Sequence, residues 1–461
     1  MDSYSYLPHH VQKFWKKYKE LFKVPINNIK ELNTIFFNGK TKFFDKIDKK
    51  YKSEGEKFIK YYKELQKLAL NLENVLPEKI RLLKKGTNGK NELTRKEAAL
   101  IFLLSFFNFI DIEQEKKCDR NQFTVYQVLS FSRNTEFEFG RCFLNYLTII
   151  GKWLSENNPI LEEKIIYIRG TRTFSKDIYK EKKNLCDIKI YEKGSLFDGD
   201  ASFCIDFANK YIGGGVLEGG CVQEEILFAI EPEAIVSMFF MEVMGDNDAI
   251  RIDNTIQYSN YLGYGHTFEF EKSAINDDLK NIKKTKFIAI DASVQFSSKH
   301  GIIDKNEISR DTYKAFVGFN LANYKIEPNN TNNEKEEKNK NKKEKNKEQK
   351  EEKENIKNNG ISIATGNWGC GAFNGDHELK FLQQWVAASF AGIERLDYYT
   401  YNSEKMKFVI KKLEQIKEKY ENANNLYKDL LTKHFGEGEV LEVLLGEENI
   451  EKNDNDDCLI I

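Results

Sequence analysis

The segment NKYIGGGVLEGGCVQEEILFAI (209–230) places five glycines directly before two adjacent carboxylates, Glu224 and Glu225. Glycine adopts positive φ and lacks a Cβ, so a run of glycines lets the backbone approach another group closely. Successive backbone N–H groups in such a run can form a nest for an anion, and a helix start adds partial positive charge. The segment is a candidate diphosphate cradle, and a flexible loop explains the glycines equally well.

The two glutamates carry the possible chemistry of this segment. Neighbouring side chains point about 100° apart on a helix and to opposite faces on a strand, so the two carboxylates should do different jobs. One would face a reacting bond while the other braces a sugar or the loop. A partly desolvated carboxylate beside phosphates has a raised pKa, which a general acid near neutral pH requires. A charged first helical turn that suits the helix dipole is the alternative reading.

A second segment, GISIATGNWGCGAFNGD (360–376), follows the same plan, because an apolar strand pattern precedes glycines interspersed with aromatic residues. Such a loop can pack backbone against phosphate and a ring against a sugar or a base. The glycine spacing differs from the GxGxxG fingerprint and from the P-loop, which ends in Lys-Ser/Thr. The sequence therefore indicates neither a nicotinamide cofactor nor ATP.

The elements that must position these loops fall into two kinds. Before about residue 150, apolar residues recur at helical spacing with few glycines, which predicts an all-helical region. Within it, 57–76 and 94–110 are predicted helices, and Thr94 with Glu97 fits a capping box. The apolar run 98–110 is too short to span a bilayer and is predicted to be a buried helix.

From about residue 185 the pattern alternates between short β-rich runs and helices at 224–242 and 378–393, which indicates a sheet covered by helices. Ligands in such folds bind at the carboxyl ends of strands, where both glycine segments lie. A charged amphipathic helix is predicted at 403–434. The predicted strands are DIKIY (187–191), FCIDFA (203–208), AIRID (249–253), KFIAIDA (286–292), ISIAT (361–365) and LDYYTY (396–401).

Composition excludes several functional classes. The chain has 461 residues, of which 40% are hydrophobic, and 71 Lys+Arg balance 72 Asp+Glu, so broad electrostatic capture of DNA or RNA is not indicated. Seven scattered cysteines and six histidines form no zinc or HExxH pattern, and the start lacks a secretory signal. We expect a soluble intracellular protein, nuclear or cytoplasmic, with reduced thiols and no metal.

Two charged segments lie outside the predicted core. Residues 328–359 contain one apolar residue, Ile356, and are predicted to be a disordered insertion within a domain. The acidic tail 436–461 ends in CLII, a C-a-a-X form that would allow prenylation of Cys458. The acidic residues before it lack the basic second signal that stable anchoring needs, which argues against lipidation.

Three blocks together resemble the poly(ADP-ribose) glycohydrolase family: DFANKYIGGGVLEGGCVQEE (206–225), GYG (263–265) and ATGNWGCGAF (364–373), in the family's order. The resemblance extends from LTRKEAALIFLLSFF (93–107) to LYKDLL (426–431). It implies an α/β fold, a macrodomain-like three-layer α/β/α arrangement with a mixed sheet, preceded by an all-helical accessory domain. The expected domains are 1–150 (helical), 151–435 (catalytic) and the tail 436–461.

The same resemblance implies hydrolysis of ribose–ribose O-glycosidic bonds in poly(ADP-ribose), free or attached to modified proteins, with ADP-ribose as product and no cofactor. By motif position, Glu225 is the catalytic acid, Glu224 holds the ribose side, and Asp206 is a further catalytic-site residue. The residues implied to bind substrate are Asn209, Gly213, Gly214, Gly215, Gln223, Tyr264, Asn367, Trp368, Gly369, Cys370, Gly371, Ala372 and Phe373.

Three correspondences depend on shifted spacing: Phe197 and Asp198 at the adenine edge, and Tyr401 where the family has an aromatic ring. Two other functions remain open. A non-catalytic reader would use the same pocket to bind ADP-ribose without turnover, although a pure binder has no need of a carboxylate beside phosphates. A nucleotide-sugar enzyme would instead bind another nucleotide tightly. Release of ADP-ribose from the polymer distinguishes the hydrolase from both.

Overall fold

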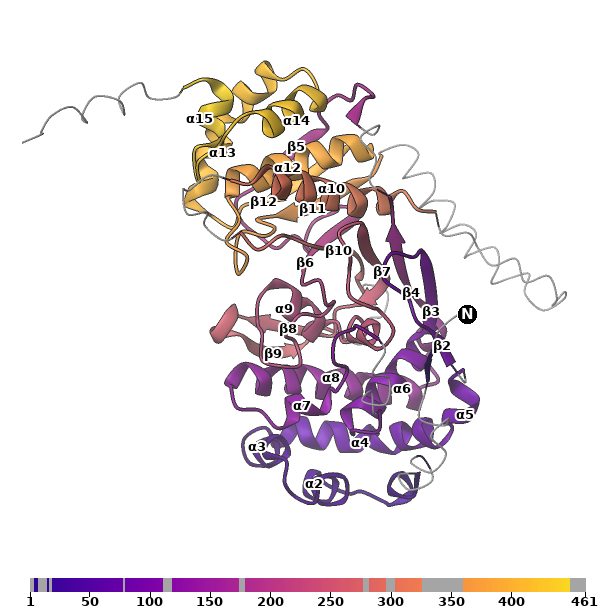
Figure 1. The fold of residues 1–461 in the computed structure, drawn as a ribbon. Coiled ribbons are helices and arrows are strands. Elements are labelled where there is room, and N and C mark those ends of the chain that lie inside the picture. Colours follow the sequence, from indigo (N-terminus) through magenta and orange to yellow (C-terminus); the bar gives the residue numbers. More distant parts are fainter. Residues whose placement is uncertain are drawn as a thin grey trace, which may run out of the picture. The chain divides into compact units, whose positions relative to one another are not determined.

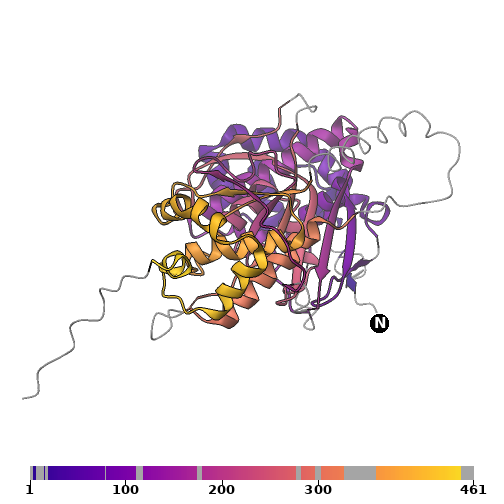
Figure 2. The same ribbon diagram turned by 90° about the horizontal axis from the view of Figure 1, so that it is seen from above.

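The computed structural model of the chain describes residues 4–6, 15, 19–77, 79–110, 118–173, 179–276, 282–295, 303–325 and 360–447. They belong to two compact units, each of which is built from two separate stretches of chain (Figures 1 and 2). The first unit comprises Met1–Arg172 and Asp206–Asp291, and the second comprises Thr173–Ile205 and Ala292–Ile461. The domain boundaries expected at residues 150 and 435 stay predictions.

Helices dominate the N-terminal part of the first unit. The predicted helix at 57–76 is confirmed as α4 and α5, and that at 94–110 as α6, a helix whose apolar residues are buried. The capping box is also confirmed, because Thr94 N donates to Glu97 Oε2 over 2.6 Å and Glu97 N donates to Thr94 Oγ1 over 3.1 Å. The helices are α2 (Ile29–Phe37), α3 (Lys42–Lys50), α4 (Lys52–Leu70), α5 (Leu72–Val75), α6 (Arg95–Phe106), α7 (Tyr126–Leu129) and α8 (Asn134–Ser155).

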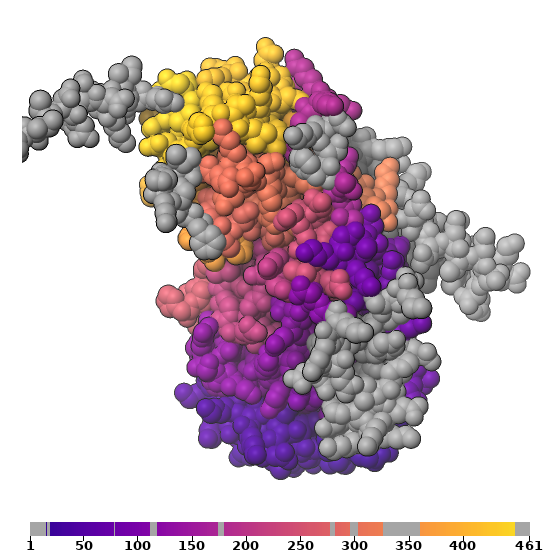
Figure 3. Space-filling view, viewed as in Figure 1, coloured from indigo at the N-terminus to yellow at the C-terminus, as the bar shows by residue number. Residues whose placement is uncertain are grey.

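Phenylalanine rings fill the space between these helices. Phe36 and Phe107 have ring centroids 4.4 Å apart, and Phe37 stacks on Phe107 at 5.9 Å with an interplanar angle of 9°. Such ring pairs add to the burial of large apolar surfaces. In the space-filling view, the indigo residues of α2 and α3 form an outer surface of this unit (Figure 3).

Four strands of the first unit form an antiparallel sheet in the order β3-β4-β7-β10. Their bounds are β3 (Gly89–Thr94), β4 (Lys164–Thr171), β7 (Asp248–Ile256) and β10 (Lys284–Asp291). The unit also contains the ribbons β1 (Tyr4–Tyr6) with β2 (Lys79–Arg81) and β8 (Ser259–Leu262) with β9 (Glu269–Ser273). Strands β2 and β3 correct the expectation of helices alone before residue 150, since runs as short and polar as GKNELT carry no clear β pattern.

The second unit contains parallel strands in the order β6-β11-β12-β5. Strand β6 supplies Phe203–Ile205 to this unit and its remaining residues to the first. All six predicted strands are confirmed, and α12 confirms the helix predicted at 378–393. The elements are β5 (Asp187–Tyr191), β6 (Phe203–Ala208), β11 (Ser362–Gly366), β12 (Arg395–Tyr399), α10 (Lys305–Ala322), α12 (His377–Ala391), α13 (Glu404–Lys419), α14 (Ala423–Thr432) and α15 (Val440–Leu445).

Two predicted helices are shorter than expected. The helix predicted at 224–242 is α9 (Gln223–Ile230), followed by a 3₁₀ turn at Ile235–Phe239. Pro232 explains the break, because the residue before a proline is disfavoured in the helical conformation, and Glu231 has φ −121° and ψ 70°. The helix predicted at 403–434 is divided into α13 and α14 by Asn422, whose side chain caps α14 by accepting from Asn425 N over 3.0 Å.

Some expectations concern residues outside the described ranges. The predicted insertion 328–359 and the C-terminal Cys458 both lie there. None of the helices in the described part of the chain is long and apolar enough to cross a bilayer.

Candidate functional site

Glu224 and Glu225 lie in the first turn of α9. Both residues are buried, with exposed fractions of 2% and 7%. Glu225 is the third residue of the helix, so its side chain can reach back to the helix start. Its Oε2 accepts from the backbone N–H of Val222 over 2.8 Å. This contact fixes one carboxylate oxygen at the helix N-terminus, where partial positive charge favours an anion.

The glycine segment wraps around the two carboxylates. Glu224 accepts from Asn209 N over 2.8 Å and from Gly213 N over 2.7 Å, and Glu225 accepts from Gly215 N over 2.9 Å. The glycine amides were expected at a diphosphate, but those of Gly213 and Gly215 each donate to a carboxylate. Both glutamates therefore hold the loop, and the expectation that one of them also faces a reacting bond stays a prediction.

Close approach to the carboxylates explains why glycine is needed at position 214. Gly214 has φ +50°, and a Cβ there would lie 2.3 Å from Glu225 Oε1 and 2.6 Å from Glu224 Oε2. Both distances are shorter than any contact that a real Cβ makes. The backbone freedom that the sequence indicated therefore serves the two carboxylates.

A third carboxylate, Asp206, belongs to the same unit. It is fully buried on β6, and neither of its carboxylate oxygens has a hydrogen-bond partner among the described residues. Burial, with the charge of Glu225, raises the pKa of Asp206 well above its usual range. Burial also raises the pKa of Glu224, and the charges of Asp206 and Glu225 add to this effect. Asp206 and Glu224 therefore retain protons at a pH where exposed carboxylates have lost theirs.

Other predicted ligand contacts in this unit surround the carboxylates. Gln223 Oε1 accepts from Phe207 N over 2.8 Å, and Asn209 Oδ1 accepts from Tyr211 N over 3.0 Å, so both side chains help to hold the loop. Tyr264 is 56% exposed, which leaves its ring open to solvent. Burial of its hydroxyl end raises the pKa of Tyr264, and the charge of Glu225 contributes to the shift.

The second glycine loop follows β11 in the second unit. Asn367 is held on both sides, since its Nδ2 donates to Thr400 O over 3.2 Å and its Oδ1 accepts from Tyr398 OH over 3.3 Å. Trp368 is 1% exposed, and its ring lies 5.1 Å from Lys380 Nζ. The ring is therefore part of the core and offers no face to a ligand, so any contact by Trp368 is limited to its backbone.

The rest of this loop has a tightly packed side and an open side. Gly369 has φ +76°, and a Cβ there would lie 2.7 Å from Ala292 Cβ. Gly371 and Ala372 are exposed, and Phe373 is partly exposed. Burial raises the pKa of the Cys370 thiol to about 12, so this cysteine is a neutral packing residue.

The three residues whose predicted roles depend on shifted spacing also lie in the second unit. Phe197 is partly buried, and Asp198 Oδ2 accepts from Ser195 N over 3.1 Å at an exposed turn. Tyr401 is 45% exposed and has φ +53°, an uncommon conformation for a residue with a side chain. The ligand contacts expected of these residues stay predictions.

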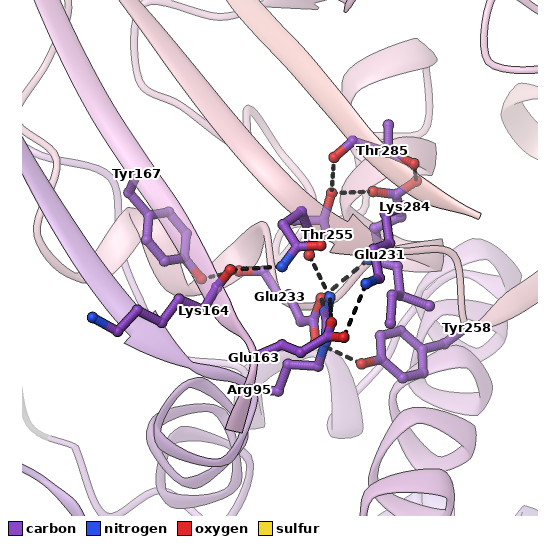
Figure 4. A network of polar contacts seen from close by, with 12 residues as sticks. Arg95, Glu163, Lys164, Tyr167, Glu231, Glu233, Thr255, Tyr258, Lys284 and Thr285 are labelled. Atoms are coloured by element: carbon purple, nitrogen blue, oxygen red, sulfur yellow. Dashed lines mark hydrogen bonds and ion pairs between the residues drawn. The ribbon is translucent and has the colours of Figure 1, made fainter. Parts of the chain in front are cut away.

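A buried polar network holds the C-terminal end of α9 (Figure 4). Arg95 Nη1 donates to Glu233 Oε2 over 2.6 Å, and Tyr258 OH donates to Glu233 Oε1 over 2.5 Å. Glu231 accepts from the hydroxyls of Thr255 and Thr285 over 2.6 and 2.8 Å. The helix that begins with the two glutamates is thus anchored to α6, β7 and β10 at its other end.

Sequence reasoning missed Asn121. Its Nδ2 donates to Ile212 O over 3.0 Å and to Gly214 O over 2.9 Å, within the loop that wraps the carboxylates. No motif marks this asparagine, and its partners lie 91 and 93 residues further along the chain. Within the described ranges, no group of three or more His, Cys, Asp and Glu side chains is placed to hold a metal ion.

Helices followed by a mixed sheet with glycine loops at strand ends define an α/β protein of the macrodomain class with a helical domain before it. Family models agree: residues 175–408 match the macro domain fold of poly(ADP-ribose) glycohydrolase, and residues 51–169 match its helical domain. The chain belongs to the poly(ADP-ribose) glycohydrolase family, which confirms the predicted family and fold class.

Individual relatives are similar at lower coverage. A probable poly(ADP-ribose) glycohydrolase 2 of Arabidopsis thaliana is 29% identical over 63% of this chain and 58% of its own length. Poly(ADP-ribose) glycohydrolase 1 of the same plant is 31% identical over 60% of this chain and 57% of its own length. The chain thus spans less than two thirds of these relatives. A poly(ADP-ribose) glycohydrolase crystal structure from Thermomonospora curvata is 14% identical over 51% of this chain and 76% of that chain, with a TM-score of 0.29.

Proposed function

We propose that this protein hydrolyses the ribose–ribose O-glycosidic bonds of poly(ADP-ribose) and releases ADP-ribose. Membership of the family and the names of the plant relatives support this function. The observation that carries it is the pair Glu224 and Glu225, buried at the start of α9 with their oxygens fixed by loop amides. Fixed, poorly solvated carboxylates beside a third acid suit proton transfer to a leaving group.

In the proposed mechanism, Glu225 is the general acid. It is the more exposed of the two glutamates, 7% against 2%, and so the better placed to reach a substrate. Protonated Glu225 gives its proton to the ribose oxygen that leaves as a hydroxyl, while the other ribose becomes an oxocarbenium-like cation. The resulting carboxylate then takes a proton from water, whose oxygen bonds to the sugar, and the acid form is restored. Glu224 holds the ribose side.

We assign the predicted contacts of Asn209, Gln223 and Tyr264, and those of the loop Asn367–Phe373, to the ADP-ribose portion of the substrate.

The resemblance also supports a domain plan with boundaries near residues 150 and 435, and polymer attached to modified proteins as a substrate. Nuclear and cytoplasmic locations, and a part in the response to DNA damage, follow from the same resemblance. Imaging the tagged protein in cells with damaged DNA tests both.

The decisive experiment incubates the protein with poly(ADP-ribose) and measures released ADP-ribose. Glu225→Gln should keep the size of the side chain, give up one of its two backbone contacts and remove the acid, reducing the rate by about 10²–10⁴-fold. Glu218→Gln is the matched control, because Glu218 is an exposed acid of the same loop. Binding of polymer by the unaltered protein without release would show a reader instead. An undiminished rate in Glu225→Gln would reject the role given to that residue.

A further inference from the structure

Asn121 contacts the glycine loop from outside, on the side away from the two glutamates. Its Nδ2 donates to the carbonyls of Ile212 and Gly214 over 3.0 and 2.9 Å, and lies 3.4 Å from the carbonyl of Tyr211. Its Oδ1 accepts from Gln122 N over 2.9 Å. That contact fixes which end of the amide faces the loop, because only the NH₂ group can donate to carbonyl oxygens.

The carbonyls that Asn121 holds belong to the same peptide units as the amides that hold the glutamates. The carbonyl of Ile212 shares a planar unit with the N–H of Gly213, and the carbonyl of Gly214 shares one with the N–H of Gly215. In a trans peptide the two groups point in opposite directions. Fixing each carbonyl toward Asn121 therefore points Gly213 N–H at Glu224 and Gly215 N–H at Glu225, over 2.7 and 2.9 Å.

A loop of this composition needs such a constraint. Gly213 and Gly214 have φ +87° and +50°, and glycine crosses between the two halves of φ space at little cost. Rotation of either peptide unit would remove an N–H from a glutamate and present a carbonyl oxygen to it. The neighbouring Asp119 ties the same segment to the loop, because Tyr211 OH donates to its Oδ1 over 2.7 Å.

We infer that Asn121 is a positioning residue that orients two peptide units of the glycine loop and thereby sets the hydrogen bonding of both Glu224 and Glu225. The inference rests on the proposed function for its effect on rate. Its effect on loop geometry is independent of that function. Asn121 itself lies within the helical-domain match, 51–169.

The electrostatic consequence has a definite sign. The N–H groups of Asn209 and Gly213 lower the pKa of Glu224 against the larger effect of burial. Loss of the hydrogen bond from Gly213 N–H would remove one of the donors that stabilise the charged form of Glu224. The pKa of Glu224 would then rise further, and any part of the pH–rate profile that follows its ionisation would move to higher pH.

Two substitutions at position 121 test the inference. Asn121→Leu keeps the approximate volume and removes both donors, and Asn121→Asp keeps the shape and replaces the NH₂ with an oxygen that faces carbonyls. Each should lower the rate of ADP-ribose release by about 10- to 100-fold, the loss of two neutral hydrogen bonds. Asn145→Leu is the matched control, because Asn145 Nδ2 donates to Tyr258 O and Ser259 Oγ and not to the loop.

Two readouts separate positioning from general damage. The pH–rate profile of Asn121→Leu should move to higher pH while that of Asn145→Leu stays in place. A crystal structure of Asn121→Leu should show the 212–213 or 214–215 peptide unit rotated. Unchanged peptide units, or a folded Asn121→Leu with the original rate and profile, would overturn the inference. If the unaltered protein releases no ADP-ribose, the proposed function fails, and the crystal structure alone still decides the role of Asn121.

Discussion

Gly214→Ala is the most informative single change at this site. A methyl group at position 214 would lie 2.3 Å from Glu225 Oε1 and 2.6 Å from Glu224 Oε2, about 1 Å inside an ordinary contact. Both atoms belong to buried carboxylates that loop amides hold, so moving them away breaks hydrogen bonds, and the cost in stability should exceed the ~1 kcal/mol that alanine pays at positive φ. A shift of about 1 Å in a catalytic group costs about 10²-fold in rate.

Gly39→Ala separates the two effects. Gly39 belongs to the same unit and has φ +68°, but a Cβ there would meet nothing within 4 Å. Urea unfolding should show Gly39→Ala destabilised by ~1 kcal/mol and Gly214→Ala by more than that. The rate of ADP-ribose release should fall about 10²-fold in Gly214→Ala alone. A Gly214→Ala enzyme as active as Gly39→Ala would refute the reasoning that the glycine exists to admit the two carboxylates.

Two further predictions concern buried charges. Burial raises the pKa of Glu231 from 4.5 to about 7, so the stability it provides is present below about pH 4.5 and lost as pH rises through 7, up to about 3 kcal/mol. When the free energy of unfolding is measured in urea from pH 5 to pH 8, it should fall less with rising pH in Glu231→Gln than in the unaltered protein. The same pH dependence in both proteins would contradict this. Lys380→Met should cost about 3 kcal/mol, because it removes the fully buried one of the two cations that pair with buried Asp311 and leaves only Arg310. A double variant with Asp311→Leu should recover most of that loss, and a cost below about 1 kcal/mol for Lys380→Met alone would exclude a strong pair.

Local patterns predicted most of the elements, because they depend on neighbours in the sequence. The capping box of Thr94 and Glu97 needs only a three-residue spacing, and the strand runs need only their β-branched and aromatic side chains. The sequence also contains the cause of the break after α9, Pro232. The apolar residues on both sides of this proline nevertheless suggested one continuous helix.

The geometry of the site could not be predicted in the same way. The sequence placed glycines beside two glutamates, but whether their amides face a ligand or a carboxylate depends on how the loop folds back onto α9. The burial of Trp368 and the role of Asn121 depend on partners distant in sequence. The sequence alone shows residue types and their spacing. It does not show the direction in which a peptide unit points.

The interleaving of the two units constrains how the chain can be made and divided. Arg95 and Arg169 are buried near the N-terminal helices, yet their carboxylate partners, Glu233 and Asp248, are synthesised more than seventy residues later. Until residue 248 has been translated, at least one of these guanidinium groups lacks its buried counter-charge, so the interior of the first unit cannot be completed before then. A protease cut in the stretch 173–205 would leave both units with all their parts, whereas a fragment that ends at residue 172 would lack the whole stretch Asp206–Asp291 of the first unit.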